Sequence, residues 1–103
     1  MNQPSLKQLK LGYGVLKYEF TVSLYFKDKS TAETIYRTLI PETLTTLTDR
    51  GDVEVHLEKG TLLKLVIKAR DLTMLRALTN SYLRLLDVTI QALKVADYYA
   101  SST

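Results

Sequence analysis

The feature that most constrains this chain is a long stretch with helical character that follows Asp71. It reads LTMLRALTNSYLRLLDVTIQALKVADYY and contains neither Gly nor Pro. Asp71 is a suitable N-cap, because its carboxylate can accept hydrogen bonds from the free amides of a first helical turn. We predict a helix from Asp71 to about Tyr99, roughly 40 Å long. Such a helix outreaches any sheet built from strands of about five or six residues.

Apolar side chains cover about half of this predicted helix and form two neighbouring rows. One row contains Leu72, Leu75, Leu83, Leu86, Ile90 and Leu93, and the other contains Leu78, Tyr82, Leu85, Ala92 and Ala96. A single row suffices for a surface helix of a small monomer. The second row is either additional core or an interface, and apolar surface of this extent favours an interface. The sequence alone does not divide the individual side chains between core and partner.

Length and composition limit the class of protein. The 103 residues fit one domain with a modest core. The net charge of +3 and the pI near 9.2 suit either an ordinary solvated surface or a contribution to nucleic-acid binding. Without cysteines there are no disulfides or thiolate metal sites. No apolar run approaches the roughly 20 residues of a membrane span, so we expect a soluble, cytoplasmic protein.

The first half of the chain predicts an arm, a strand and a helix. Residues 1–14 show no convincing period and are interpreted as a flexible arm. From Val15, strict alternation predicts a strand with one face in the core, formed by Tyr18, Phe20, Val22, Leu24 and Phe26. Ser30 and Glu33 have the spacing of a capping box, which predicts a helix start. Pro41 is expected to stop or bend this helix near Ile40, and residues 42–52 are interpreted as a connection.

The second half predicts a β-hairpin before the long helix. Two alternating runs flank the Lys59-Gly60 turn, and the more apolar second run indicates a central strand. The order strand, helix, strand, strand, helix predicts an α+β fold: a three-stranded antiparallel sheet with both helices on one face. We assign this single domain to residues 15–99 and expect residues 100–103 to fray. The open face would carry Thr21, Ser23, Tyr25, Glu54, His56, Lys64 and Lys68.

The sequence offers few groups for catalysis. His56 is the only histidine and lies at a polar strand position between Glu54 and Glu58, which indicates a solvated surface and not a metal site. The four glycines are isolated, so there is no phosphate-binding loop. Some of the seven tyrosines could stack on bases, but Tyr18, Tyr36 and Tyr82 lie on apolar rows that are typical of a core. We predict a small interaction domain without a cofactor, not an enzyme.

Three segments carry a resemblance to a known family. Residues 69–86 read ARDLTMLRALTNSYLRLL, residues 36–43 read YRTLIPET, and Arg50 precedes the second predicted strand. This pattern resembles the small Pcc-type subunit of the KEOPS (EKC) complex, a family that includes the animal LAGE-like proteins. The resemblance covers about residues 18–93. It implies a three-stranded antiparallel sheet with two helices, in agreement with the order of elements predicted above.

The resemblance also implies partners and site residues. Members of the family are non-catalytic, dimerise, and bind the Kae-type (TsaD-like) subunit, which transfers threonylcarbamoyl to the adenosine beside the anticodon of tRNA. The complex also contains a Bud-type kinase-like subunit, which this chain would reach only indirectly. Candidate residues for the interface with a twin or the catalytic subunit are Leu75, Leu78, Asn80, Ser81, Tyr82, Leu85, Leu86 and Leu93. Candidate tRNA-binding residues are Lys7, Lys10, Arg50, Lys64, Lys68 and Arg70.

Two alternative functions stay open. The extensions before Val15 and after Leu93 are compatible with a diverged copy that acts like the fungal Gon-type partner in a heterodimer. A stand-alone RNA-binding module can also have this order of elements, although the chain lacks a GxxG loop and an RNP-like aromatic pattern. A small enzyme acting through His56 ranks last.

Overall fold

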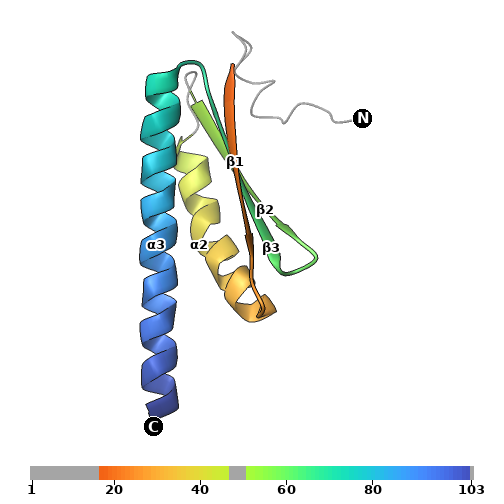
Figure 1. Cartoon of the computed structure of the whole chain (residues 1–103), viewed down its shortest axis with the longest axis vertical. Coiled ribbons are helices and arrows are strands. Elements are labelled where there is room, and N and C mark those ends of the chain that lie inside the picture. Colours follow the sequence, from red (N-terminus) through yellow and green to blue (C-terminus); the bar gives the residue numbers. More distant parts are fainter. Residues whose placement is uncertain (1–16, 47–50, 103) are drawn as a thin grey trace.

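A computed structural model describes residues 17–46 and 51–102 of the chain. The elements follow in the order β1 (Tyr18–Tyr25), α2 (Lys29–Thr46), β2 (Gly51–Glu58), β3 (Leu62–Ala69) and α3 (Leu72–Ser102). Figure 1 shows α3 alongside α2 and the sheet, with its C-terminal end projecting beyond both. The predicted α+β fold and order of elements are confirmed. The predicted arm at residues 1–14 lies outside the described residues.

The three strands form one antiparallel sheet in the order β1-β3-β2. The central position predicted for the third strand is confirmed. β2 and β3 are joined by a tight turn in which both Lys59 (φ 55°) and Gly60 (φ 76°) have left-handed backbone conformations. Positive φ at both central residues matches the right-handed twist of the two strands that the turn connects.

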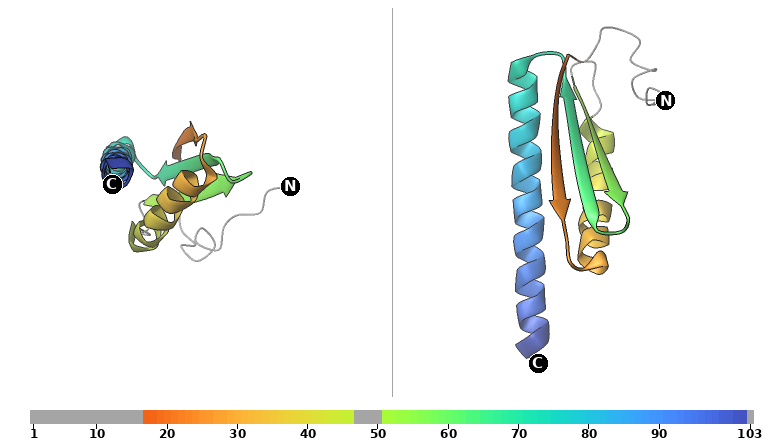
Figure 2. Two further views of the ribbon diagram at one scale, coloured as in Figure 1. Left: turned by 90° about the horizontal axis from the view of Figure 1, so that it is seen from below. Right: turned by 45° about the vertical axis from the view of Figure 1, so that its right-hand side comes forward.

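Both helices lie against the same face of the sheet, as predicted (Figure 2). The buried core combines Ile35 and Leu39 of α2, Val53 and Val55 of β2, Leu63, Leu65 and Ile67 of β3, and Tyr82 and Leu86 of α3. Directly paired residues such as Val53 and Ile67 point to the same side of the sheet, and alternate positions of β3 are buried on that side.

The edge strand β1 only partly meets its prediction. Val22, Leu24 and Phe26 pack against the core, as the alternation predicts. Tyr18 and Phe20 lie on the same alternating face but are 38% and 41% exposed. The alternation predicts which face a side chain occupies, but the helices must also cover that part of the face. At the N-terminal end of β1 they leave it open.

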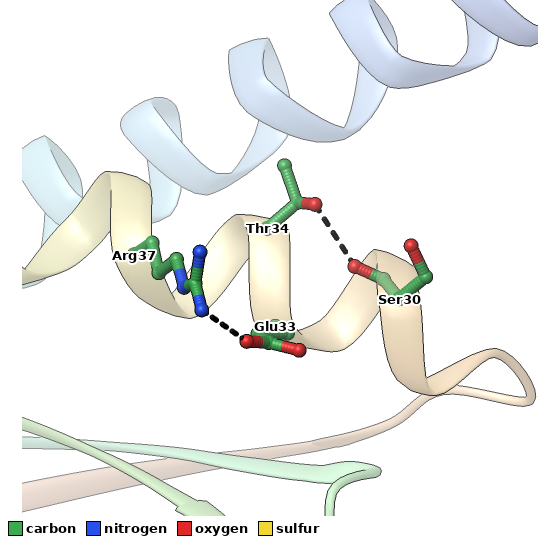
Figure 3. A network of polar contacts seen from close by, with 4 residues as sticks. All are labelled: Ser30, Glu33, Thr34 and Arg37. Carbon is green, nitrogen blue, oxygen red and sulfur yellow. Dashed lines mark hydrogen bonds and ion pairs between the residues drawn. The ribbon is translucent and has the colours of Figure 1, made fainter.

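The start of α2 differs from the predicted capping box. The Asp28 carboxylate accepts from the Ser30 backbone N–H at 3.0 Å and from the Thr31 hydroxyl at 3.0 Å, so Asp28 is the cap. Glu33 instead pairs with Arg37 one turn later, at 2.5 Å, as Figure 3 shows. The capping-box prediction is therefore wrong. Asp and Ser serve equally well as N-caps, and here the chain enters the helix two residues earlier.

The end of α2 was also predicted too early. The helix continues through Pro41 to Thr46, so residues 42–46 are not part of the connection. Pro41 lies on the exposed side, where water can satisfy the carbonyl that loses its helical partner. On the opposite side, Thr43 is buried and its hydroxyl donates to the Ile40 carbonyl at 2.7 Å. Packing of this last turn outweighs the local preference of proline.

The long helix α3 is confirmed, with Asp71 as its N-cap. The Asp71 carboxylate accepts from the Met74 backbone N–H at 2.7 Å, and the Asp71 carbonyl accepts from Leu75 N–H at 3.0 Å. The helix has 31 residues and continues to Ser102, although the sequence predicts fraying from residue 100. We call residues 95–102 the α3 overhang.

Candidate interaction surfaces

The side of α3 that faces the sheet belongs to the core of the chain itself. Tyr82 and Leu86 are only 4% and 3% exposed. Leu75, Leu78, Leu85 and Leu93 are partly buried and pack against the same core. Of the predicted interface residues, Tyr82 and Leu86 therefore have almost no surface left for a partner. The other four leucines offer one part of their surface to the core and another part to the outside.

A groove follows the side of α3 that borders α2. It is lined by Glu42 of α2 and by Leu78, Ser81, Tyr82 and Leu85 of α3. A second hollow continues along α3, between Ser81, Arg84, Leu85 and Val88. The structure thus brings the predicted residues Leu78, Ser81 and Leu85 together on one concave surface. Asn80 is exposed but does not line either hollow.

Further large apolar side chains of α3 are exposed in addition to the predicted interface residues. Val88 and Val95 of α3 are 59% and 54% exposed, and Tyr99 is 64% exposed. A spacing of alternately three and four residues connects them to Leu78, Ser81 and Leu85. The two rows predicted from the sequence also advance mainly in steps of three and four residues, but they include neither Val88 nor Val95.

A second apolar surface occurs away from this groove. Leu72 and Leu83 of α3 are 56% and 40% exposed, and Tyr18 and Phe20 of β1 are exposed as well. β1 pairs only with β3 in the described sheet, so its outer edge presents backbone N–H and C=O groups. The exposed apolar residues of α3 therefore fall on two sides of the helix.

The open face of the sheet carries ion pairs between neighbouring strands. Lys64 Nζ lies 3.3 Å from Glu58 Oε1, and Lys68 Nζ lies 3.3 Å from Glu54 Oε2. His56 Nε2 is 3.5 Å from the other oxygen of Glu54. These glutamates offset much of the positive charge of the two predicted tRNA-binding lysines. Arg70 is exposed just beyond β3, whereas Lys7, Lys10 and Arg50 lie outside the described residues.

The described residues show no arrangement typical of a metal site or a membrane helix. Residues 17–46 and 51–102 contain no group of three or more His, Cys, Asp or Glu side chains able to hold a metal ion. No helix among these residues is long and apolar enough to cross a bilayer. The imidazole of His56 is half exposed, and its nearest charged partner is Glu54.

Comparison with known proteins identifies the family. The model of the family described as transcription factor Pcc1 matches residues 19–94, which is most of the chain and spans β1 to α3. The chain belongs to the Pcc1 family. This confirms the resemblance to the Pcc-type KEOPS subunit. No curated protein matches the chain.

Membership in the Pcc1 family sets the general role of the surfaces described above. Pcc1 proteins are a family of KEOPS subunits and are non-catalytic, so the chain is a KEOPS-type subunit of a multi-subunit complex. The family match ends at residue 94. The α3 overhang therefore lies outside the matched segment.

Proposed function

We propose that this chain is the dimerisation and scaffold subunit of a KEOPS complex. In this role it binds the Kae-type catalytic subunit and so supports threonylcarbamoylation of the adenosine beside the anticodon of tRNA. The proposal rests on the observation that α3 of this Pcc1-family chain, a 31-residue helix, has exposed apolar side chains on two sides. Contiguous apolar surface on a small soluble domain marks protein–protein contact.

A scaffold that joins two copies and also binds another protein requires two separate surfaces. The groove side of α3, with Ser81, Leu85 and Val88, is one candidate. Leu72 and Leu83, together with the open edge of β1, form the other. Each surface has an apolar centre and polar neighbours, which is the composition typical of protein interfaces.

We also propose that the chain helps to hold tRNA within the complex, through Lys64, Lys68, Arg70 and the basic residues outside the described part. Contacts of this kind are made to phosphates and carry no base specificity. The glutamates beside Lys64 and Lys68 mean that a phosphate has to compete with an existing ion pair. The contribution of the sheet face to affinity is accordingly expected to be modest.

Light scattering behind a sizing column tests the scaffold role. We expect the chain alone to elute with twice the mass of one 11.7 kDa protomer, and to form a larger species when mixed with the catalytic subunit from the same cell. As a control for catalysis, His56→Ala should leave modification by the assembled complex unchanged. A monomer that does not bind the catalytic subunit, or loss of activity in His56→Ala, would refute the scaffold proposal.

A further inference from the structure

The outer edge of β1 has backbone groups that the described sheet leaves open. The Phe26 N–H donates to the Thr61 carbonyl at 2.9 Å and continues the register of β1 on β3, so Phe26 and Thr61 form a hydrogen-bonded pair. Hydrogen-bonded and non-hydrogen-bonded pairs alternate along an antiparallel ladder. The even-numbered residues of β1 therefore bond to β3. The N–H and C=O groups of Lys17, Glu19 and the odd-numbered residues that follow point to the outer edge.

The helix side of the first half of β1 is also uncovered. Tyr18 and Phe20 are 38% and 41% exposed, although their side chains lie on the face that packs against the core farther along the strand. Leu72, at 56% exposure, follows three residues after Ala69, the β3 residue that pairs with Tyr18. A strand added at this edge would satisfy the open backbone groups. It would also cover these apolar side chains if its own apolar residues faced the helices.

The segment directly before β1 has the required alternation. Residues 7–11 read KQLKL, in which Leu9 and Leu11 are separated by a polar residue. A turn at Tyr13-Gly14 would join this segment to residues 15–20, and it has the same X-Gly form as the Lys59-Gly60 turn between β2 and β3. Such a sequence is typical of the tight turn between two antiparallel strands.

One register of this hairpin satisfies both the backbone and the side chains. A two-residue turn opposes Leu11 with Leu16, Lys10 with Lys17, Leu9 with Tyr18 and Gln8 with Glu19. Both leucines of the segment then face the helix side, whereas a shift by one residue would turn them to the open face. The hydrogen-bonded pairs are those of Lys17 and Glu19, whose backbone groups point outward. Lys10 faces Lys17, but Glu19 lies diagonally opposite and offsets this repulsion.

We propose that residues 7–11 pair antiparallel with residues 16–20 of the same chain and form a fourth strand beside β1. A strand from a second copy could use the same edge. The chain's own segment is favoured, because a short connection holds it at an effective concentration of about millimolar. The pairing places Lys10 on the face that carries Lys64 and Lys68, and it leaves residues 22–25 of the edge to a protein partner. This inference goes beyond the proposed function and does not depend on it.

Amide hydrogen exchange measured by NMR on the full chain tests the pairing. Leu9→Asn removes an apolar contact on the helix side, and Gln8→Asn is the matched control on the open face. We expect the Lys17 and Glu19 amides to exchange at least about tenfold faster in Leu9→Asn than in the natural sequence or in Gln8→Asn. The amides of β1 that bond to β3 should exchange equally in all three proteins, which checks the fold. Equal rates for Lys17 and Glu19 in all three would overturn the proposal.

A disulfide trap identifies the chain that supplies the strand. The sequence has no cysteine, so Gln8→Cys with Glu19→Cys introduces a single pair. Directly opposed residues with Cα atoms about 5.5 Å apart suit a disulfide. In a glutathione redox buffer we expect an intramolecular bond at least about tenfold more often than in Lys7→Cys with Glu19→Cys, whose side chains would lie on opposite faces. Equal trapping in both variants, or disulfide-linked dimers in place of linked monomers, would overturn the proposal.

Discussion

At the scale of single residues, Gly51 determines how closely α3 approaches the sheet. A Cβ atom at this position would lie 2.6 Å from Leu78 Cδ1, 3.2 Å from Met74 Cγ and 3.3 Å from the Lys68 carbonyl oxygen. Gly51 is therefore required by space and not by backbone conformation. Nothing in the sequence around Gly51 distinguishes it from a glycine in a turn, so the sequence favours a connection there, whereas the structure places Gly51 at the start of β2.

Gly51→Ala is expected to destabilise the fold by about 1–3 kcal/mol, because the added methyl group forces α3 away from β2. Urea unfolding of the two proteins measures the difference. Combining Gly51→Ala with Leu78→Ala should recover part of the loss, since the second change removes the nearest atom. Strictly additive effects of the two changes would show that Leu78 is not the side chain in conflict.

Lys59 has the least favourable backbone conformation of the β2–β3 turn, with φ at 55°. Asn tolerates the left-handed region better than Lys, so Lys59→Asn should stabilise the protein by about 0.5–1 kcal/mol. The midpoint of urea unfolding would rise. Gly60→Ala is the opposite control and should lower the midpoint, because φ is 76° there and Lys29 Cδ lies 3.3 Å from the new Cβ. An unchanged midpoint in Lys59→Asn would contradict the strain that we assign to this residue.

Asp71 stabilises the first turn of α3 through the hydrogen bond that its carboxylate accepts from Met74 N–H. Asp71→Ala is expected to lower the free energy of unfolding by about 1 kcal/mol. Asp71→Asn keeps an accepting oxygen and should stay close to the natural protein. If the Ala and Asn variants were equally unstable in thermal unfolding, charge and not capping would be the source of the effect.

At the scale of elements, the parts predicted well are those specified by a long local pattern. α3 was predictable because a stretch of this length without Gly or Pro favours a helix, and Asp71 marks its start. The central position of β3 followed from its apolar content on both faces. The end of α2 was not predictable, because burial of Thr43 outweighs Pro41 only in the folded chain. The exposure of Tyr18 and Phe20 likewise depends on where the helices end over the sheet.

The interface was predictable only as a property of α3. The sequence predicts that α3 has more apolar surface than a core requires, and the exposed Val88, Val95 and Tyr99 agree with this. Tyr82 lies on an apolar row typical of a core, and its burial agrees with this, but the sequence could not divide the two neighbouring rows between the core and a partner. Which row faces the sheet depends on the rotation of the helix about its axis, and tertiary packing sets this rotation.

Two substitutions within α3 distinguish its core side from its outer side. Tyr82→Ala removes a side chain that is 4% exposed and should cost about 3 kcal/mol or more in unfolding free energy. Val88→Ala, at 59% exposure, should change it by less than about 0.5 kcal/mol. Chemical denaturation of the isolated protein measures both. Equal destabilisation would mean that α3 is rotated differently about its axis.

At the scale of the whole molecule, the helices cover one face of the sheet and leave a charged face open. Both signs of charge are present there, and the lysines of β3 lie within 3.3 Å of the glutamates of β2. The net charge of +3 therefore does not gather on this face. Nucleic acid would be attracted mainly by the sum of many weak contacts across the assembled complex.

Replacing Lys64 and Lys68 together with Gln is expected to weaken tRNA binding by the complex a few-fold and to reduce the salt dependence by about one to two units of log-log slope. Assembly should be unaffected. Binding titrations at several salt concentrations provide the measurement. Lys27→Gln with Lys29→Gln makes the same change of charge at the junction of β1 and α2, where Lys29 is the first residue of α2, and serves as the control. A slope identical to that of the control would exclude the sheet face as a tRNA contact.

Because α3 is long, a small change in its direction at the edge of the sheet produces a large displacement of its C-terminal end. Its 31 residues span about 46 Å, so a change of about 10° in its direction near Asp71 displaces its far tip by about 8 Å. The contact of Leu78 with Gly51 lies near the N-terminal end of α3. The absence of a side chain at Gly51 thus helps to set the position of Tyr99 at the opposite end of α3. A substitution at Gly51 would displace Tyr99 without contacting it.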